Sequence, residues 1–206
     1  MPTDTISRRN VLVVGTAATI TGVLAGPALA LAAEPGGSKG DVAILSAAYD
    51  LESQGIWAYG AAGAKLTDTP VGKTVLALAS RNKADHEQHR TALGNAIRSL
   101  GATPPEPKKE YDLSTYIGAG EGGLGSDADI ARLALALEVD AALAYQGAFA
   151  KLKNGKLQSA AMSIMPVEVG HATAIRAALG GLMKGVEAVP TAFLSADTRK
   201  SWVITG

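Results

Sequence analysis

The sequence contains no cysteine, so the chain can form neither a disulfide nor a thiolate site for an iron–sulfur cluster. Aromatic residues are also scarce, at 4% of the 206 positions, although 47% of the residues are hydrophobic and Ala and Leu are abundant. This composition favours closely packed helices over a sheet rich in Val and Tyr. We therefore expect an all-helical protein in which any metal is held by His and carboxylate side chains.

An excess of charge of one sign is lacking too, because 19 basic residues balance 19 acidic ones. Nucleic acid would gain no long-range attraction to such a chain, and we do not expect it as a partner. The glycine-rich segment 118–125 is not followed by the Gly-Lys-Ser/Thr of a phosphate-binding loop. The chain has only three histidines, all in predicted helices, so a Ser-His-Asp hydrolase site is not expected.

Residues 1–33 form a segment of a different kind. Ser7-Arg8-Arg9 precedes a long apolar run that contains an A-x-A cleavage pattern at 28–30, which is typical of a twin-arginine signal peptide. Residues 34–40 then have the composition of a flexible linker. An N-terminal membrane anchor is the alternative, since the run approaches the roughly 20 residues that span a bilayer. We expect export to the periplasm or another extracytoplasmic location, with no stable membrane span after cleavage.

Four helices are predicted from apolar residues that recur every three or four positions. The first runs from Asp41, as its N-cap, to Leu66, where a cluster of Thr, Asp and Pro ends it. Pro166 lies inside the last helix, where a kink is expected. The other three helices are predicted over residues 71–100, 126–153 and 156–183.

The connection between the second and third helices, residues 102–126, is rich in Pro and Gly and unusually long for a loop in a single domain. A segment of this length can run along a bundle and join two antiparallel helix pairs. A loose loop in an up-down bundle is the alternative. We therefore predict an all-α four-helix bundle over residues 41–185, followed by a tail at 186–206 whose Phe193 and Trp202 dock on the bundle or on a second subunit.

The first and third helices share an internal repeat. Residues 51–66 and 137–152 both read L-E, five residues, A-Y, four residues, A-K-L. In each copy the Glu and the Tyr lie two turns apart on one stripe of the helix. The residues that the repeat pairs are Glu52 with Glu138 and Tyr59 with Tyr145. We interpret the tyrosines first as core residues, and second as hydrogen-bond donors or redox-active phenols beside a site.

The second and fourth helices carry all three histidines. Glu168 and His171 form an E-x-x-H motif, which places a carboxylate and an imidazole on one helical face, one turn apart. His86 occupies the corresponding position before His89. The two halves of the chain therefore read as Glu52 with H-x-x-H and Glu138 with E-x-x-H.

Residues that meet across an antiparallel hairpin lie at similar distances from its turn. The midpoint between Glu52 and the H-x-x-H motif falls at the predicted turn 68–70, and that between Glu138 and the E-x-x-H motif falls at the turn 154–155. We therefore expect one level of the bundle to hold all six side chains. They are Glu52, His86, His89, Glu138, Glu168 and His171.

Six polar groups inside an Ala- and Leu-rich core are costly, because an unpaired buried carboxylate carries a penalty of several kcal/mol. Metal ions remove that penalty, so these six residues are predicted to form a metal site. Imidazole and carboxylate ligands suit iron, manganese or zinc, and we favour iron as a di-iron site. Two divalent ions bring four positive charges against three carboxylates, so an oxide, hydroxide or water could complete the site.

The bundle and these motifs resemble the ferritin-like superfamily, and more closely the exported bacterial proteins described simply as ferritin-like. In that superfamily one Glu from each of two helices and an E-x-x-H from each of the other two hold two metals. The resemblance implies two metal ions, one of them held by Glu52 and His89. Glu138 and His171 would hold the other ion, and Glu168 would bridge the two.

His86 stands where the superfamily has its second bridging Glu, and there the chain departs from the pattern. An imidazole ligates one ion through one nitrogen, so the second metal is expected to be weaker or absent. The adjacent Asp85 and Glu87 could substitute, but Glu87 lies about 100° round the helix from His86 and is expected to face solvent. Whether His86 is a ligand or a neighbour of the ligands stays open.

The expected function is that of an exported ferritin-like metal-binding protein whose di-iron or iron/manganese site reacts with O2 or peroxide, as in a di-metal oxidase or a peroxidase-like enzyme. No individual catalytic residue follows from the sequence. The alternative, motivated by His86, is a non-catalytic helical module that binds metal or a partner and protects the cell envelope against stress. Metal ions are the expected partners, and assembly into a homo-oligomer is left open.

Overall fold

Every regular element in the part of the chain that the computed structural model describes, residues 39–206, is a helix. The four long helices are α1 (Lys39–Gly63), α2 (Pro70–Ser99), α4 (Asp127–Lys151) and α5 (Gly155–Gly180). The short ones are α3 (Ser114–Gly118), the 3-10 helix η1 (Ala196–Thr198) and α6 (Arg199–Trp202). The all-helical fold expected from the composition is confirmed, and the twin-arginine segment lies outside the described residues.

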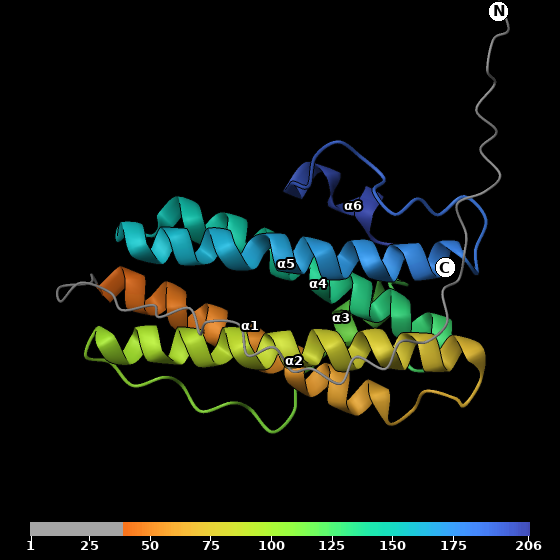
Figure 1. Cartoon of the computed structure of the whole chain (residues 1–206), viewed down its shortest axis with the longest axis horizontal. Coiled ribbons are helices and arrows are strands. Elements are labelled where there is room, and N and C mark those ends of the chain that lie inside the picture. Colours follow the sequence, from red (N-terminus) through yellow and green to blue (C-terminus); the bar gives the residue numbers. More distant parts are fainter. Residues whose placement is uncertain (1–38) are drawn as a thin grey trace, which may run out of the picture.

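The long helices form two hairpins, α1 with α2 and α4 with α5, which pack against each other as a four-helix bundle (Figure 1). The segment after α2 runs back along the α1–α2 pair before it enters α3. Lys108 Nζ lies 2.7 Å from an Asp50 carboxylate oxygen, and the ring of Tyr111 lies 5.9 Å from that of Trp57. These contacts hold the crossover against α1, so the predicted connectivity of two hairpins and a long crossover is confirmed.

The starts of three long helices follow from their capping residues. The Thr69 side chain accepts a hydrogen bond from Gly72 N, and Pro70 is the first residue of α2, where its fixed φ suits a helix. Ser126 accepts from the backbone of α4 in the same way, and Asn154 from that of α5. Each long helix ends one to three residues earlier than the periodicity predicted.

Asp41 is not the N-cap that the sequence predicted. α1 begins at Lys39, so Asp41 lies in the first turn, where it is buried. Its carboxylate accepts a hydrogen bond of 2.9 Å from Lys153 N, just after α4. This acidic residue therefore ties the first turn of α1 to the second hairpin.

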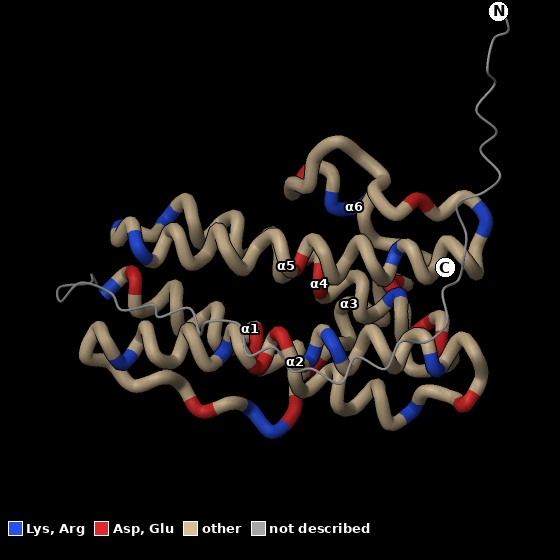
Figure 2. The backbone as a smooth tube through the Cα atoms, in the orientation of Figure 1, with Lys and Arg blue, Asp and Glu red and all other residues tan. Residues whose placement is uncertain are grey.

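Two apolar clusters fill the bundle, one toward each end. One gathers residues from the start of α1, the end of α2 and the α4–α5 turn, with Leu45, Ile97 and Leu157 among them. The other gathers the start of α2, the first half of α4 and the end of α5. α4 is long and apolar enough to cross a membrane by length and composition, but a buried core helix passes the same test. Acidic positions from several helices lie midway along the bundle (Figure 2), between the two clusters.

The two aromatic residues singled out in the tail differ in their burial. Trp202 is buried in the second apolar cluster, and its indole nitrogen donates to Phe193 O at 3.1 Å. Phe193 itself is 76% exposed and does not dock on the bundle, so for this residue only the alternative of docking on a second subunit stays a prediction. Arg199 connects the tail to the rest of the fold, with ion pairs to Glu121 of the crossover and Asp140 of α4.

Candidate metal centre

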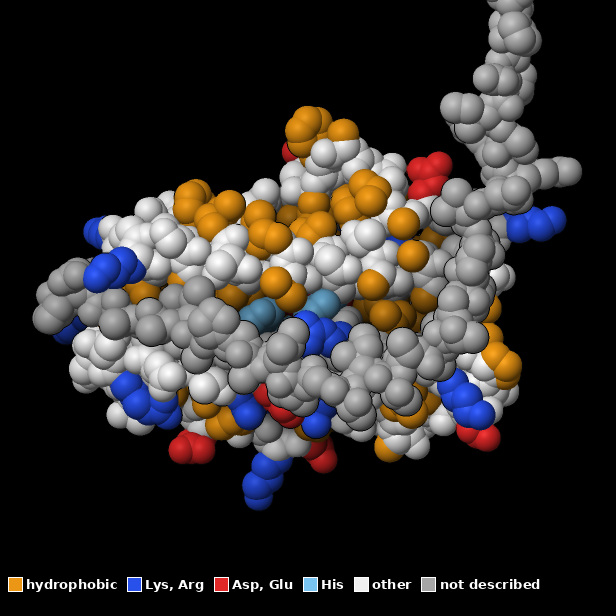
Figure 3. Space-filling view, in the orientation of Figure 1, with side chains coloured by type: hydrophobic (Ala, Val, Ile, Leu, Met, Phe, Trp, Pro, Cys, Tyr) orange, Lys and Arg blue, Asp and Glu red, His pale blue; other side chains and the backbone are white. Residues whose placement is uncertain are grey.

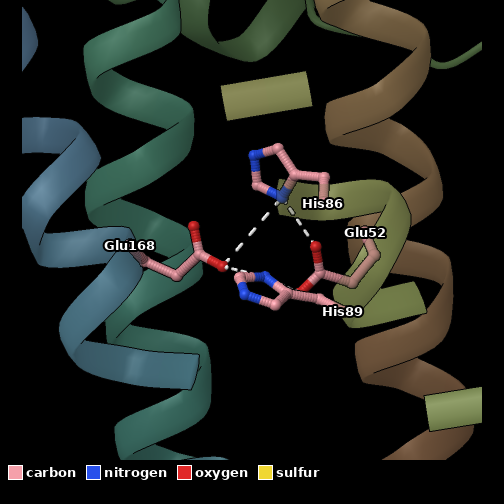
Figure 4. A group of neighbouring side chains, drawn as sticks. All are labelled: Glu52, His86, His89 and Glu168. Atoms are coloured by element: carbon pink, nitrogen blue, oxygen red, sulfur yellow. Dashed lines mark hydrogen bonds and ion pairs between the residues drawn. The ribbon is translucent and has the colours of Figure 1, made fainter. Parts of the chain in front are cut away.

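The six side chains singled out by the sequence lie together at the middle of the bundle. Their donor atoms fall into two groups, and within each group they lie within 4.8 Å of one another. The first group, drawn in Figure 4, consists of Glu52, His86, His89 and Glu168. The second consists of His86, Glu138, Glu168 and His171. All four long helices contribute, which is the convergence that the two equal turn distances predicted.

In the first group, Glu52 and Glu168 approach two histidines from opposite sides (Figure 4). His86 Nδ1 lies 2.6 Å from Glu52 Oε2. His89 Nδ1 lies 3.6 Å from Glu52 Oε1 and 2.9 Å from Glu168 Oε1. The last two atoms form an ion pair but are not joined by a hydrogen bond. His89 Nδ1 and Glu168 Oε1 are therefore buried without a hydrogen-bond partner among the described residues.

The second group is built round Glu138. Its Oε1 lies 3.3 Å from His86 Nε2, and its Oε2 lies 3.3 Å from His171 Nδ1. His171 Nδ1 is also 3.1 Å from Glu168 Oε2. The two oxygens of Glu168 thus face different groups, and so do the two nitrogens of His86.

Burial and histidine contacts act against each other on the three carboxylates, all of which are at most 1% exposed. Burial raises the pKa of a carboxyl group, because it penalises the charged form. For Glu52 and Glu138 the hydrogen bonds from histidines outweigh burial, and the pKa of each falls below its usual value. For Glu168 burial prevails, helped by the charges of Glu138 and Glu52, and its pKa is raised.

The same balance keeps the histidines protonated when no metal is bound. Burial lowers the pKa of His86, but contacts with Glu138 and Glu52 outweigh it and raise the pKa to about 11. Burial also lowers the pKa of His89 and His171, but nearby carboxylates outweigh it and raise the pKa to about 9 for His89 and about 10 for His171. Imidazolium groups therefore neutralise the buried carboxylates, and a metal ion would have to displace their protons.

The repeated tyrosines bond crosswise between the two hairpins. Tyr59 of α1 donates to Glu138 of α4, and Tyr145 of α4 donates to Glu52 of α1. Burial, together with the nearby carboxylate, holds the pKa of each phenol well above its usual value, so both stay protonated donors. The tyrosines are therefore buried residues of the bundle that also orient the two glutamates.

Two polar residues beside the cluster add further hydrogen bonds to it. Asp85 is buried, and its Oδ2 lies 3.2 Å from His171 Nε2, on the far side of the ring from Glu138. Asn82, which the sequence reasoning missed, donates to the Tyr59 hydroxyl at 2.9 Å. Its signal was available, because Asn82 is a polar residue four positions before His86 on the same helical stripe. Glu87 is exposed, as predicted.

The donor set fits a divalent transition metal. Imidazole nitrogens and carboxylate oxygens suit iron, manganese and zinc, and the chain has no thiolate that would favour softer ions. A cation bound by His89 Nδ1 and Glu168 Oε1 would satisfy both of these buried atoms, which form an ion pair but no hydrogen bond. His171 would then bind through Nδ1 and donate from Nε2 to Asp85, an arrangement that commonly orients metal-binding histidines.

The two hairpins, the crossover and the central Glu/His cluster define a ferritin-like helical bundle with a candidate metal site. The family model described as Ferritin-like domain matches residues 40–181, and the chain belongs to this family. Among solved structures, a crystal structure of a conserved hypothetical protein, rv2844, from Mycobacterium tuberculosis is similar. It is 25% identical, has a TM-score of 0.57, and the match covers 67% of this chain and 96% of that one. No curated protein matches the chain.

Proposed function

We propose that this chain is an exported protein that binds iron, or iron with manganese, and reacts with O2 or peroxide. The observation that carries the proposal is a central cluster of Glu and His whose three carboxylates are buried, and in which His89 Nδ1 and Glu168 Oε1 have no hydrogen-bond partner among the described residues. Redox-active ions bound there would supply the electrons that reduce O2 or peroxide. Export rests on the twin-arginine pattern in residues 1–33.

The protein side chains would hold and orient the ions. Glu52 and His89 would ligate one metal, Glu138 and His171 the other, and Glu168 would face both. The tyrosines would fix the orientation of the two non-bridging glutamates through their crossed hydrogen bonds. The apolar clusters on both sides would keep bulk water away from the ions.

An aerobic titration of the metal-free protein with Fe²⁺ tests this function, with absorbance and oxygen uptake followed together. We expect a metal-dependent absorbance that saturates at a fixed stoichiometry, together with oxygen consumption. Glu168→Gln should lose both signals. Glu87→Gln is the matched control, since Glu87 is exposed on α2 beside the cluster and pairs with Lys83. A wild-type protein that binds iron without consuming oxygen would eliminate the oxidase function.

The second candidate function is a non-catalytic metal-binding module, and the position of His86 favours it. Its imidazole lies between Glu52 and Glu138, within 2.6 Å and 3.3 Å of their oxygens, where a second metal would otherwise compensate both charges. Elemental analysis of protein purified from its own compartment separates the two functions. Stoichiometric zinc would favour the non-catalytic module, and iron or iron with manganese would favour the oxidase.

A further inference from the structure

A cavity of about 310 Å³ lies between α1 and α4, beneath the crossover. Its walls come from all four long helices, and α3 with its neighbouring residues covers it on the outside. Asp112 is the one charged residue in the lining; it is exposed and accepts a hydrogen bond from Ser114 N. The interior surface is therefore apolar, and we call this space the apolar cavity.

Small side chains leave this space open. Close-packed protein interiors contain few voids larger than a water molecule, and unfilled volume lowers the stability of the fold. The walls of the apolar cavity carry alanine where a larger apolar residue would fill the space. These alanines are Ala58, Ala61, Ala62, Ala79, Ala131, Ala134 and Ala178. A bound molecule that occupies the cavity would recover the missing contacts.

We propose that the apolar cavity binds one uncharged, apolar small molecule about the size of a two-ring aromatic hydrocarbon. An enclosed apolar cavity of about 150 Å³ accepts benzene, and this cavity, which opens to solvent at the crossover, is roughly twice as large. A charged ligand is disfavoured, because its ionic group would lose water without gaining a partner from these walls.

The entrance lies at the crossover. Ile117 and Leu124, which line the cavity, are 48% and 45% exposed, so an apolar rim meets solvent there. Histidine atoms are visible at the surface on the side where α2 and α5 lie in front (Figure 3). In a four-helix bundle this side is opposite the α1–α4 seam. An apolar molecule can therefore enter without passing the Glu/His cluster.

The inner end of the apolar cavity adjoins the candidate metal centre. Tyr59 and Leu137 line the cavity and also a separate space of about 20 Å³, which touches His86 and Glu138. That smaller space is large enough for a single water molecule. A molecule in the apolar cavity would contact the ring of Tyr59, whose hydroxyl donates to Glu138. Its binding needs no metal, so this inference goes beyond the proposed function.

Calorimetric titration of the full, metal-free chain with naphthalene tests the proposal. We expect saturable binding of one molecule per chain, with a dissociation constant on the order of 10–100 μM. The charged analogue 1-naphthoate should bind at least about tenfold more weakly. No saturable binding, or equal affinity for the two ligands, would overturn the proposal.

Two filling substitutions locate the ligand. Ala134→Phe fills the cavity from α4 and Ala62→Phe fills it from α1, and each should weaken naphthalene binding at least about tenfold. Ala144→Phe is the matched control on α4, because Ala144 lies in a separate surface groove beside Tyr145. It should bind naphthalene like the wild type. Wild-type affinity in both filled variants, with their helical content and melting temperature retained, would place the ligand elsewhere. A wild-type protein that binds naphthalene but binds no metal would contradict only the proposed function.

Discussion

Protonated histidines at the centre of the bundle make metal binding depend on pH. Carboxylates outweigh burial and raise the pKa of His89 to about 9 and that of His171 to about 10. A histidine must lose its proton to ligate a metal, so protons compete with the ion throughout the neutral range. We expect the apparent affinity for Zn²⁺ to rise by at least about tenfold for each pH unit between pH 6 and pH 8.

Calorimetric zinc titrations in buffers of different ionisation enthalpy measure this dependence, because they report both the affinity and the protons released. The direction follows from the raised histidine pKa values: lowering the pH adds protons to the ligands and weakens binding. An affinity that stays constant from pH 6 to pH 8 would show that these histidines are not ligands.

Asp85 is predicted to support His171 without touching the metal. Its carboxylate lies 3.2 Å from His171 Nε2, the ring nitrogen that faces away from Glu138. Removing such a partner from a metal-binding histidine commonly costs about 10- to 100-fold in affinity. Asp85→Asn should therefore weaken zinc binding by that factor while its circular dichroism stays unchanged. Glu87→Gln, with the same loss of charge two residues away, should leave the affinity unaltered.

At the residue scale, the sequence predicted the cluster better than its surroundings. Six side chains could be named because Glu and His stand out on Ala-rich helical faces and because turn distances relate the two halves of a hairpin. The partner of Asp85 could not be predicted, since it depends on which side of the His171 ring faces α2. The crossed pairing of the tyrosines likewise depends on the offset between α1 and α4.

Replacing either of two glycines of α1 by alanine is predicted to change the free energy of unfolding in opposite directions. A Cβ at Gly55 would lie 3.1 Å from His86 Nε2, whereas a Cβ at Gly60 meets nothing within 4 Å. Alanine stabilises an exposed helical position by about 0.5–1 kcal/mol relative to glycine, but overpacking a filled site costs about 1–3 kcal/mol. Gly60→Ala should therefore raise the free energy of unfolding, and Gly55→Ala should lower it and weaken metal binding.

Denaturant unfolding of both variants, followed by zinc titration, gives the comparison. Equal stabilisation by the two substitutions would mean that His86 has room to move, and its position would then not depend on α1. Both residues lie on one helix, so the gain in helix propensity is the same for the two substitutions. It therefore cancels when their changes in the free energy of unfolding are compared.

At the scale of helices, periodicity and capping residues predicted all four long elements. Thr69, Pro70, Ser126 and Asn154 act through their immediate neighbours, so local sequence was sufficient to find these starts. Asp41 was misassigned because its hydrogen-bond partner, Lys153 N, is far away in the sequence. Local rules predict a cap from residue type, but only the tertiary fold shows where an acidic side chain finds its donor.

For the whole molecule, Arg199 is predicted to hold the tail and the crossover on the bundle. Its guanidinium lies 2.6 Å and 2.9 Å from the two oxygens of Glu121, and 2.5 Å and 2.9 Å from those of Asp140. Hydrogen bonds to charged groups contribute about 1.5–3 kcal/mol each when buried, and less where solvent reaches them. Arg199→Met should lower the free energy of unfolding by about 2 kcal/mol.

The control is Lys200→Met, which removes the same charge from an adjacent exposed position and should change stability little. Thermal melts of the two variants at equal ionic strength measure the difference. Equal melting temperatures would contradict the role of Arg199. The connectivity of the bundle was predictable from the length of the crossover, whereas this ion-pair network was not. Its members are 59 and 78 residues apart along the chain, and no local pattern relates them.

The crossed tyrosine–glutamate bonds have a consequence for how the protein unfolds. Each hairpin supplies a phenol that donates to the other hairpin's glutamate, so separation of the halves would break both of these hydrogen bonds at once. Partial opening is then unfavourable whichever half moves first. The two halves of this duplicated pattern should therefore lose structure together, in a single cooperative transition, and neither should persist as an independent folding unit.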